Sequence, residues 1–417
     1  MAEGLSRRQW LLVGLVFIAV ALNYVDRQII ALLKPTLEAE FGWSNRDYGR
    51  MASAFQFSAA VAYLAVGWFL DRFGLRRGFA VGVGGWSLAA IAHAFAGSVG
   101  AFVGARAVLG AFEATGTPAA VKSAATYFQP SVRSLVIGIG NTAPNIGAVV
   151  APLTIPAIAL AVGWRNTFVI AGSLGLVWTA VWLAARLPEP LPQPPAPPRE
   201  QGALIRHLGQ RRQWALILAK VLSDQGWFFL LFFLPDFFAK TFGLKQGTVG
   251  GPVALVYLLA GLGAFTGGLL TSRLIARGLS MNAARKRALL IYALLVLPVP
   301  AVLGLDSPWS AALLLGLALF AHQGFSTNVF GLATDLFPAR SVGLAIGIAA
   351  FGGNMGSVAV NEFAGWALDR GLGYAPMLWM VAVSYLAALA AVQAIVPRIP
   401  DREADSVPLP PGALLAH

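Results

Sequence analysis

Apolar runs of about 20 residues recur along the whole chain, and each run can cross a bilayer as one α-helix. We count twelve, at residues 10–33, 50–70, 78–97, 100–120, 134–158, 165–186, 213–238, 250–275, 287–305, 309–333, 342–367 and 374–396. Because a bilayer offers no water to unpaired backbone groups, runs of this kind form helices. The sequence therefore predicts an all-α membrane protein with twelve transmembrane helices.

The composition agrees with a membrane protein and excludes several other classes. Of the 417 residues, 57% are hydrophobic and 12% are charged, whereas soluble domains have about 25% charged residues. The chain has no cysteine, which excludes disulfides, thiol catalysis and cysteine-ligated metals. It has no P-loop, no metal-binding spacing among its histidines and no convincing catalytic triad. We therefore predict neither a cofactor nor an enzymatic activity.

The net charge of +12 follows from the orientation of the helices, so we predict no nucleic-acid partner. If the N-terminus is cytoplasmic, most Lys and Arg residues outside the apolar runs fall in cytoplasmic segments. Only a few fall in the outer loops, where we place Lys34, directly after the first run. The positive-inside rule then predicts that both termini are cytoplasmic.

The longest polar break, residues 187–212, divides the twelve runs six and six. Its core, PEPLPQPPAPP, is too rich in proline for a helix and predicts an extended linker. We therefore predict an N-terminal six-helix bundle at 1–186, a cytoplasmic linker at 187–212, a C-terminal six-helix bundle at 213–396 and a cytoplasmic tail at 397–417.

The two halves also resemble each other in sequence. The stretch GWFLDRFGLRRG (67–78) recurs as GGLLTSRLIARG (267–278), and NIG at Asn145 recurs as NMG at Asn354. Repeats of this kind predict two bundles of the same topology, with substrate bound between them near the bilayer midplane. The bundles then rock against each other, so that the site opens to each side in turn.

Charged residues inside the apolar runs are the strongest candidates for function, since a charge at bilayer depth is costly. Arg27 offers a planar fork that stays charged, and we predict that it holds the carboxylate of a substrate. The alternative is a plain ion pair with Asp26 or Glu113. Adjacent helix residues point about 100° apart, so Asp26 and Arg27 do not face one point, whereas Asn23 lies on the face of Arg27.

Asp26 and Glu113 are our candidates for proton binding. Burial favours the protonated form of a carboxyl and a nearby cation favours the charged form, so a carboxyl under both influences can bind and release a proton. Arg106, two turns before Glu113 on one helix face and about 10 Å away along the axis, is predicted to modulate one of these carboxyls. The alternative is a static network that fixes the helices.

Polar residues of the second half are candidates for contact with a polyol. They are His322, Gln323, Ser326 and Asn328 in the tenth run and Asn354 in the eleventh, and they offer hydrogen bonds without a fixed charge. The alternative for each is a hydrogen bond between helices. We add Asn145, the repeat counterpart of Asn354, to the predicted substrate-binding residues. Asp71, Arg72 and Arg76 lie at a helix end, and we predict that they form a conformational latch.

The motif G-x-x-x-D-R-x-G-x-R-R at Gly67–Arg77 resembles the signature loop of the major facilitator superfamily. Within it, NYVDR in the first run and Arg106 with Glu113 resemble the anion:cation symporter family. Three stretches, KVLSDQGWFFLLFFLP (220–235), AHQGFSTNVFGLATDLFP (321–338) and GNTAPNIGAVVAP (140–152), resemble bacterial hexuronate transporters. The chain departs from these at Ala59, where a tyrosine is expected, and at Tyr63, where a glutamine is expected.

The resemblance implies proton-coupled uptake of a sugar acid anion such as glucuronate or galacturonate, and it favours Tyr24 as a substrate contact. It implies a monomer in the bacterial inner membrane, with the lipid bilayer, the substrate and protons as its partners. Another organic anion, such as an aldonate or an aromatic carboxylate, is the alternative substrate. A receptor that binds its ligand without moving it is the alternative function.

Overall fold

The computed structural model describes residues 5–192 and 202–399. In this part of the chain the elements are α1 (Arg7–Phe41), α2 (Asn45–Phe73), α3 (Leu75–His93), α4 (Val99–Glu113), α5 (Gly116–Tyr127), α6 (Pro130–Gly140), α7 (Ala143–Val162), α8 (Trp164–Ala184), α9 (Ala203–Leu208), α10 (Arg211–Phe242), α11 (Gly250–Ala276), α12 (Met281–Val296), the 3-10 helix η1 (Val299–Gly304), α13 (Pro308–Leu336), α14 (Ala339–Asp369) and α15 (Ala375–Ile395). The predicted all-α fold is confirmed, and each of the twelve predicted runs falls on helix.

Ten helical stretches in the described residues are long and apolar enough to cross a membrane. The other two predicted spans are α3, which has 19 residues, and the pair α4 and α5, which is interrupted directly after Glu113. The fifth span is also divided, between α6 and α7, where Pro144 follows the break. A proline has no N–H to donate and its ring disfavours helical backbone before it, so the break falls where the sequence places this residue.

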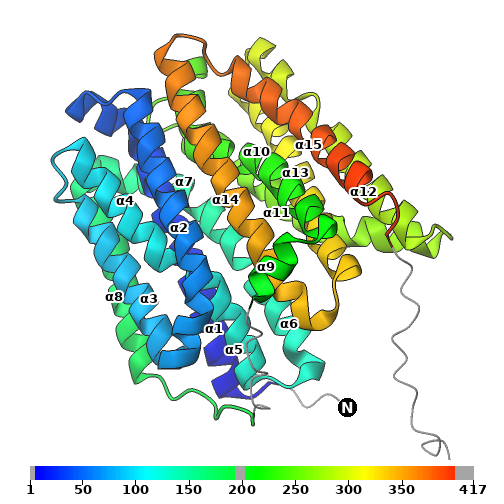
Figure 1. Ribbon diagram of the computed structural model, residues 1–417. Coiled ribbons are helices and arrows are strands. Elements are labelled where there is room, and N and C mark those ends of the chain that lie inside the picture. The colour runs from blue at the N-terminus through cyan, green and yellow to red at the C-terminus, as the bar shows by residue number, and fades with distance from the viewer. Residues whose placement is uncertain (1–4, 193–201, 400–417) are drawn as a thin grey trace, which may run out of the picture.

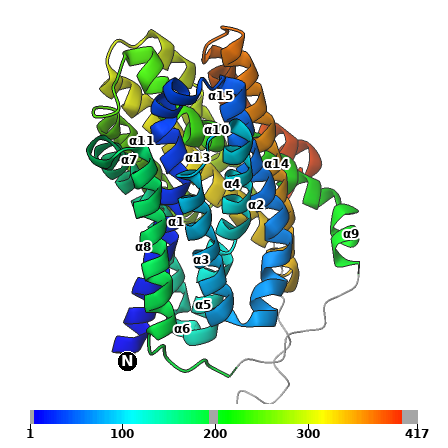
Figure 2. The ribbon, with the colours of Figure 1, turned by 90° about the vertical axis from the view of Figure 1, so that its left-hand side faces the viewer.

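Helices α1–α8 form one half of the molecule, here called the N half, and α10–α15 form the C half. The halves meet where α2 packs on α14, α7 on α11 and α1 on α10; Figure 1 shows α14 beside α2, and Figure 2 shows α7 beside α11. We call the end of the bundle where α1 begins the near end and the end where α1 finishes the far end.

The first helix is longer than its apolar run. It begins after Ser6, whose side chain and Gln9 form a capping box, and it continues to Phe41, where Gly42 adopts the left-handed conformation (φ 65°) that ends many helices. Lys34 therefore lies inside α1, with only 1% of its surface exposed. The prediction that Lys34 belongs to an outer loop is wrong, because the apolar run ends eight residues before the helix does.

Most of the predicted linker core and of the predicted tail lies outside the described residues. The described part of the linker contains the short helix α9, which follows the proline-rich core. Near the start of the linker, the backbone N–H of Leu191 donates to the carbonyl of Thr126, so this segment runs against the near end of α5.

Candidate functional site

Arg27 lies in the middle of α1 and forms an ion pair with Glu113 at the last turn of α4. Its Nη2 is 3.0 Å from Glu113 Oε2, and its Nε donates to the same oxygen at 3.1 Å. Arg27 is 8% exposed and Glu113 is 1% exposed. Both guanidinium contacts use Oε2, and Glu113 Oε1 has no hydrogen-bond partner in the described structure. The guanidinium thus holds this carboxylate through one oxygen.

Other groups fix the position of the Arg27 guanidinium. Nη2 also donates to Asn23 Oδ1 at 3.2 Å, and Asn23 Nδ2 donates to the backbone carbonyl of Glu113 at 3.2 Å. The guanidinium carbon stands 4.6 Å from the centre of the Tyr24 ring and 5.1 Å from that of Phe55, a geometry that stabilises a cation. The break after α4 exposes the carbonyl that Asn23 binds, since the last carbonyls of a helix lack partners in the helix.

Asp26 and Arg106 are buried beside this pair, and several of their atoms have no partner. Asp26 is 2% exposed and Arg106 is fully buried. Arg106 Nη1 donates to the carbonyl of Arg27 at 3.5 Å. Asp26 Oδ2 and Arg106 Nε and Nη2 have no hydrogen-bond partner among the described residues. We call Asn23, Asp26, Arg27, Arg106 and Glu113 the arginine cluster.

The arginine cluster faces the other half of the molecule. The Arg106 guanidinium stacks on Phe55 of α2 at 4.4 Å and lies 5.8 Å from the ring of Phe232, which belongs to α10 in the C half. The Tyr48 hydroxyl, from α2, donates to the carbonyl of Phe232 at 2.6 Å. The cluster therefore lies at the boundary between the two halves, where the sequence repeat predicts the substrate.

The predicted substrate-binding residues of α13 have different surroundings: Gln323 is partly exposed and His322 contacts aromatic residues, whereas the amide of Asn328 is fully hydrogen-bonded. Gln323 is partly exposed. His322 stacks on Trp227, with ring centres 5.3 Å apart, and its Nδ1 is 2.8 Å from the Tyr385 hydroxyl. Asn328 uses both ends of its amide within the C half.

The amide nitrogen of Asn328 donates to the carbonyls of Gly267 and Gly324, and its oxygen accepts from Thr271 and Arg285. These bonds join α11, α12 and α13, so they favour the alternative interpretation of Asn328, a hydrogen bond between helices.

Asn354 and Asn145 both lie where the halves meet. Asn354 Oδ1 accepts from Gln56 of α2 at 3.3 Å, and Gln56 also donates to Ser357. Asn145, in α7, lies against Gly261 of α11, where a Cβ would come to 3.4 Å from that of Asn145. The structure therefore brings this repeated pair to two of the helix contacts between the halves, α2 with α14 and α7 with α11.

The predicted latch residues all lie at the near end of the N half. Asp71 forms an ion pair with Lys122 of α5 at 2.6 Å. Arg76 donates to the carbonyls of Leu183 and Ala185 at 2.6 and 3.0 Å, whereas Arg72 is exposed. These contacts join α2, α3, α5 and the end of α8, and the latch function stays a prediction.

The predicted polyol site contains an ion pair that was not predicted from the sequence. Lys220 Nζ lies 2.8 Å from Asp224 Oδ1, one turn along α10, and donates to Ser326 at 3.2 Å. Both charged residues are 6% exposed. The prediction that the polar residues of the C half include no fixed charge is therefore incomplete. The i, i+4 spacing of a lysine and an acid within an apolar run was the sequence pattern that could have indicated this ion pair.

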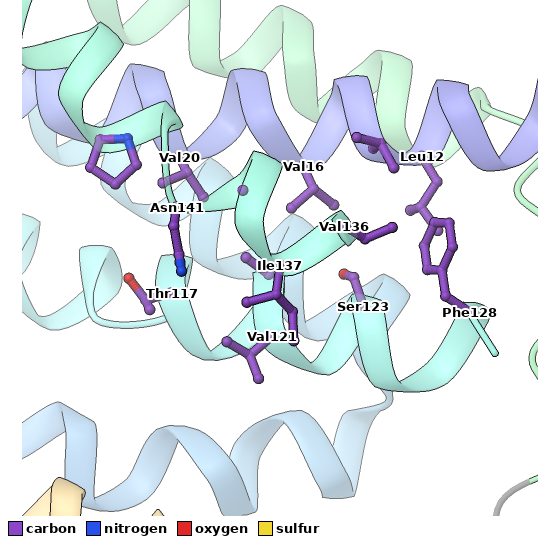
Figure 3. Close-up of a pocket in the computed structure, with 14 residues that line it drawn as sticks. Leu12, Val16, Val20, Thr117, Val121, Ser123, Phe128, Val136, Ile137 and Asn141 are labelled. Atoms are coloured by element: carbon purple, nitrogen blue, oxygen red, sulfur yellow. The ribbon is translucent and has the colours of Figure 1, made fainter. Parts of the chain in front are cut away.

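A pocket of about 50 Å³ lies between α1, α5 and α6. Figure 3 shows the mainly apolar side chains around it, such as Val16, Val136 and Ile137, with Thr117, Ser123 and Asn141 as its polar members. Ligand sites are typically about 300 to 1,000 Å³, so this pocket is too small for a sugar acid. It is also lined entirely by the N half, and we assign it to helix packing.

The family model of the Major Facilitator Superfamily matches residues 16–360. The chain belongs to this superfamily. It is 27% identical to a D-galactonate transporter of Escherichia coli O6:H1, over 92% of this chain and 95% of that protein. It is also 27% identical to a hexuronate transporter of Escherichia coli K12, over 90% and 91%.

A galacturonate transporter of Dickeya chrysanthemi is 28% identical, over 73% of this chain and 93% of that protein. The predicted family resemblance is thus confirmed, and the chain is a multi-pass membrane transporter.

Solved structures show the same fold. A bacterial homologue of the human lysosomal transporter Spinster, in an inward-facing and occupied conformation, has a TM-score of 0.71 at 18% identity, covering 94% of this chain and 96% of that chain. A D-xylose–proton symporter has a TM-score of 0.73 at 16% identity, covering 92% and 97%. At these identities the likeness concerns the fold alone, and it agrees with two six-helix bundles.

Proposed function

We propose that this transporter takes up a sugar acid such as a hexuronate, together with protons, by alternating access. The observation that carries the proposal is the unsatisfied polar chemistry of the arginine cluster. Glu113 Oε1, Asp26 Oδ2 and two nitrogens of Arg106 are buried without partners. A buried polar atom without a partner costs about 1 to 3 kcal/mol, and four such atoms of three charged residues gather here, which supports a site that a substrate or a proton completes.

Arg27 is the proposed anion site, and its ion pair with Glu113 suggests how binding is coupled to protons. A substrate carboxylate competes with Glu113 for the guanidinium. If Glu113 leaves as a charged carboxylate, the charge is buried without a partner, which is strongly unfavourable. If Glu113 takes a proton first, it leaves as a neutral group. Substrate binding and protonation of Glu113 therefore favour each other.

Asp26 is the proposed second proton site, with Arg106 beside both carboxyls. A hexuronate enters as a monoanion, and a negative interior opposes its entry by about 2.3 kcal/mol per 100 mV. One proton cancels the charge, and a second makes the cargo net positive, so the potential then drives uptake. We therefore expect more than one proton per substrate.

The proposed partners of the rest of the substrate are Tyr24, Asn145, His322, Gln323 and Asn354. The orientation belongs to the same proposal. We place both termini in the cytoplasm of a bacterium and the chain in the inner membrane as a monomer, so the far end faces outward. The domain boundaries given above and the latch formed by Asp71, Arg72 and Arg76 also belong to the proposal.

An aldonate is the second candidate substrate, because a D-galactonate transporter is among the relatives. Purified protein in liposomes separates the candidates when uptake is measured for glucuronate, galacturonate, galactonate and benzoate under an inward proton gradient. We expect the sugar acids to accumulate and benzoate not to. Binding without flux for every compound would instead indicate a receptor.

The same liposomes test the coupling. Uptake is compared with and without an inside-negative potassium diffusion potential, and the proton-to-substrate ratio is measured. We expect the potential to stimulate uptake. A ratio of one proton per substrate, with no effect of the potential, would leave Asp26 as a structural partner of the arginines.

A further inference from the structure

The first helices of the two halves, α1 and α10, begin and end alike. Both start with the four residues Arg-Arg-Gln-Trp, at 7–10 and 211–214, and both close with Phe-Gly, at 41–42 and 242–243. Each also carries one internal proline close to its far end, Pro35 or Pro235. The two helices thus occupy equivalent places in the repeat and lie against each other across the boundary between the halves.

At the far end the two helices carry ion pairs of opposite order. In α1 the lysine comes first, with Lys34 Nζ 2.8 Å from Glu38 Oε2. In α10 the acid comes first, with Asp236 Oδ1 3.4 Å from Lys240 Nζ. Both pairs have i, i+4 spacing, which places the two charges on one face of the helix. Two helices of like sequence therefore present complementary charges to each other.

These charges also pair across the boundary. Lys34 Nζ lies 2.7 Å from Asp236 Oδ1, and Lys240 Nζ lies 3.4 Å from Glu38 Oε1. We call Lys34, Glu38, Asp236 and Lys240 the charge quartet; its formal charge is zero. The side chains of Lys34 and Asp236 are each 1% exposed, whereas those of Glu38 and Lys240 are 28% and 39% exposed. The quartet has a buried inner pair and a solvated rim pair.

Neighbouring groups complete the hydrogen bonds of the quartet. Asn45 Oδ1, at the start of α2, accepts from Lys34 at 3.0 Å and from Lys240 at 2.9 Å. The Tyr374 hydroxyl, directly before α15, donates to Asp236 Oδ2 at 2.5 Å. Asp369, at the end of α14, accepts from the backbone N–H groups of Asn45 and Arg46. The far ends of α1, α2, α10 and α14 are thus tied together.

We propose that the charge quartet is the gate of the far end: it holds the halves together in this conformation and separates in every transport cycle. The inner pair carries most of the effect, since a buried charge that loses its partner is strongly disfavoured. Once the halves part, water reaches Lys34 and Asp236, and the loss of either partner matters less. A charge change at the inner pair therefore shifts the population toward the state that is open at the far end.

This inference rests on the transport function but not on the identity of the substrate, so its test needs no substrate. The chain has no cysteine, and one thiol can be introduced by Ser53→Cys. Ser53 lies in α2, eight residues beyond Asn45, where its hydroxyl donates to the carbonyl of Val358 in α14. Ser53 is 6% exposed and lies in the contact between α2 and α14, which a closed far end shields from reagents on that side.

The readout is the labelling rate of this thiol by a membrane-impermeant maleimide in sealed vesicles. A Leu372→Cys variant identifies the far side, because Leu372 is 49% exposed in the loop before α15. In the Lys34→Met background we expect far-side labelling of the Ser53→Cys thiol to rise at least about tenfold, which corresponds to a shift of about 1.4 kcal/mol. Asp236→Asn should act in the same direction.

Two controls separate a gate from a general loss of structure. Lys245→Met removes an exposed lysine just beyond α10 and should leave the labelling rate unchanged. The exchange Lys34→Asp with Asp236→Lys restores an opposite-charge inner pair, but it also places an acid beside Glu38 and a lysine beside Lys240, so it should recover part of the protection. If the single variants do not purify as monodisperse protein, the rim variants Glu38→Gln and Lys240→Gln give smaller increases in the same assay.

Unchanged labelling in the Lys34→Met and Asp236→Asn backgrounds overturns the proposal. So does an equal increase with Lys245→Met, which would indicate a nonspecific effect. Failure of uptake for every compound in the panel, with labelling as predicted, would overturn the proposed function and leave the gate in place.

Discussion

The arginine cluster and the charge quartet both contain buried charges and share helix α1, yet their polar groups are satisfied to different degrees. In the quartet each charge has an opposite charge within 3.4 Å, and Asn45 and Tyr374 supply further hydrogen bonds. In the cluster, four of the charged or polar atoms of Asp26, Arg106 and Glu113 have no partner in the described structure. The difference separates two uses of buried charge.

A satisfied group stabilises the conformation in which it forms. The ion pairs of the quartet join the two halves, so their energy depends on the position of one half relative to the other. A group with unpartnered polar atoms instead favours the binding of a ligand or a proton that supplies the missing partners. Its ion pair, Arg27 with Glu113, lies wholly within the N half, so it can persist while the halves move and can exchange one partner for a ligand. The first group suits a gate and the second a binding site.

The largest expected effect on substrate binding follows the replacement of Arg27. Arg27→Lys keeps the charge and removes the planar fork. Hydrogen bonds to a charged group contribute about 1.5 to 3 kcal/mol, so we expect affinity for the best sugar acid to fall roughly tenfold to a hundredfold. Calorimetry measures it. An affinity within about threefold of the parent protein would contradict the assignment of Arg27.

Glu113→Gln should separate exchange from accumulation. The amide imitates the protonated carboxyl, so the variant can bind and exchange substrate but cannot release a proton. We expect accumulation driven by a pH gradient to collapse, while exchange of labelled for unlabelled substrate across the liposome membrane continues. A variant that still concentrates substrate under an imposed gradient would show that Glu113 is not essential for coupling.

The inner and rim pairs of the quartet should differ in thermal stability. Loss of one partner from a buried pair costs about 3 to 5 kcal/mol, whereas exposed pairs contribute about 0 to 1 kcal/mol. A double-mutant cycle with Lys34→Met and Asp236→Asn should therefore show a large coupling, and one with Glu38→Gln and Lys240→Gln a small one. Melting temperatures of the purified variants in detergent measure both; equal couplings would remove the distinction between inner and rim pairs.

The sequence allowed the fold and the members of the arginine cluster to be predicted, for identifiable reasons. In a bilayer the backbone groups of an apolar run of about 20 residues find hydrogen-bond partners only when the run forms a helix, so all twelve spans were predictable. Arg27 and Glu113 stood out because charges in such runs are costly. The ion pair of Arg27 with Glu113 was one of the alternatives, but the sequence could not decide between them, since the pairing depends on the break after α4 and on the packing of α1 against that helix end.

Lys34 and Asp236 were missed for a different reason. Lys34 follows the last apolar residue of its run, and its burial comes from contact with the other half rather than from its own helix. A sequence shows which residues share a helix face, but the partner of that face depends on how the bundles dock. Asn328 illustrates the same limit. Its spacing fits a substrate contact, but three of its four hydrogen bonds are made with α11 and α12 and the fourth with Gly324 of its own helix.

The smallest expected effect concerns two amides of α13 that the sequence treats alike. Gln323 is partly exposed beside His322, and in the proposed site it donates to or accepts from one hydroxyl of the substrate. A neutral hydrogen bond contributes about 0.5 to 1.5 kcal/mol, so Gln323→Ala should weaken binding roughly twofold to tenfold. Its melting temperature without substrate should match that of the parent protein.

Asn328→Ala is the matched control, and it should behave in the opposite way. Asn328 is fully buried, and its removal leaves Gly267, Thr271 and Arg285 each without one partner. We expect the melting temperature to fall by several degrees, since each buried group left unsatisfied costs about 1 to 3 kcal/mol, while affinity measured well below that temperature changes little. If Asn328→Ala instead weakens binding more than Gln323→Ala and leaves stability unchanged, Asn328 contacts the substrate and Gln323 does not.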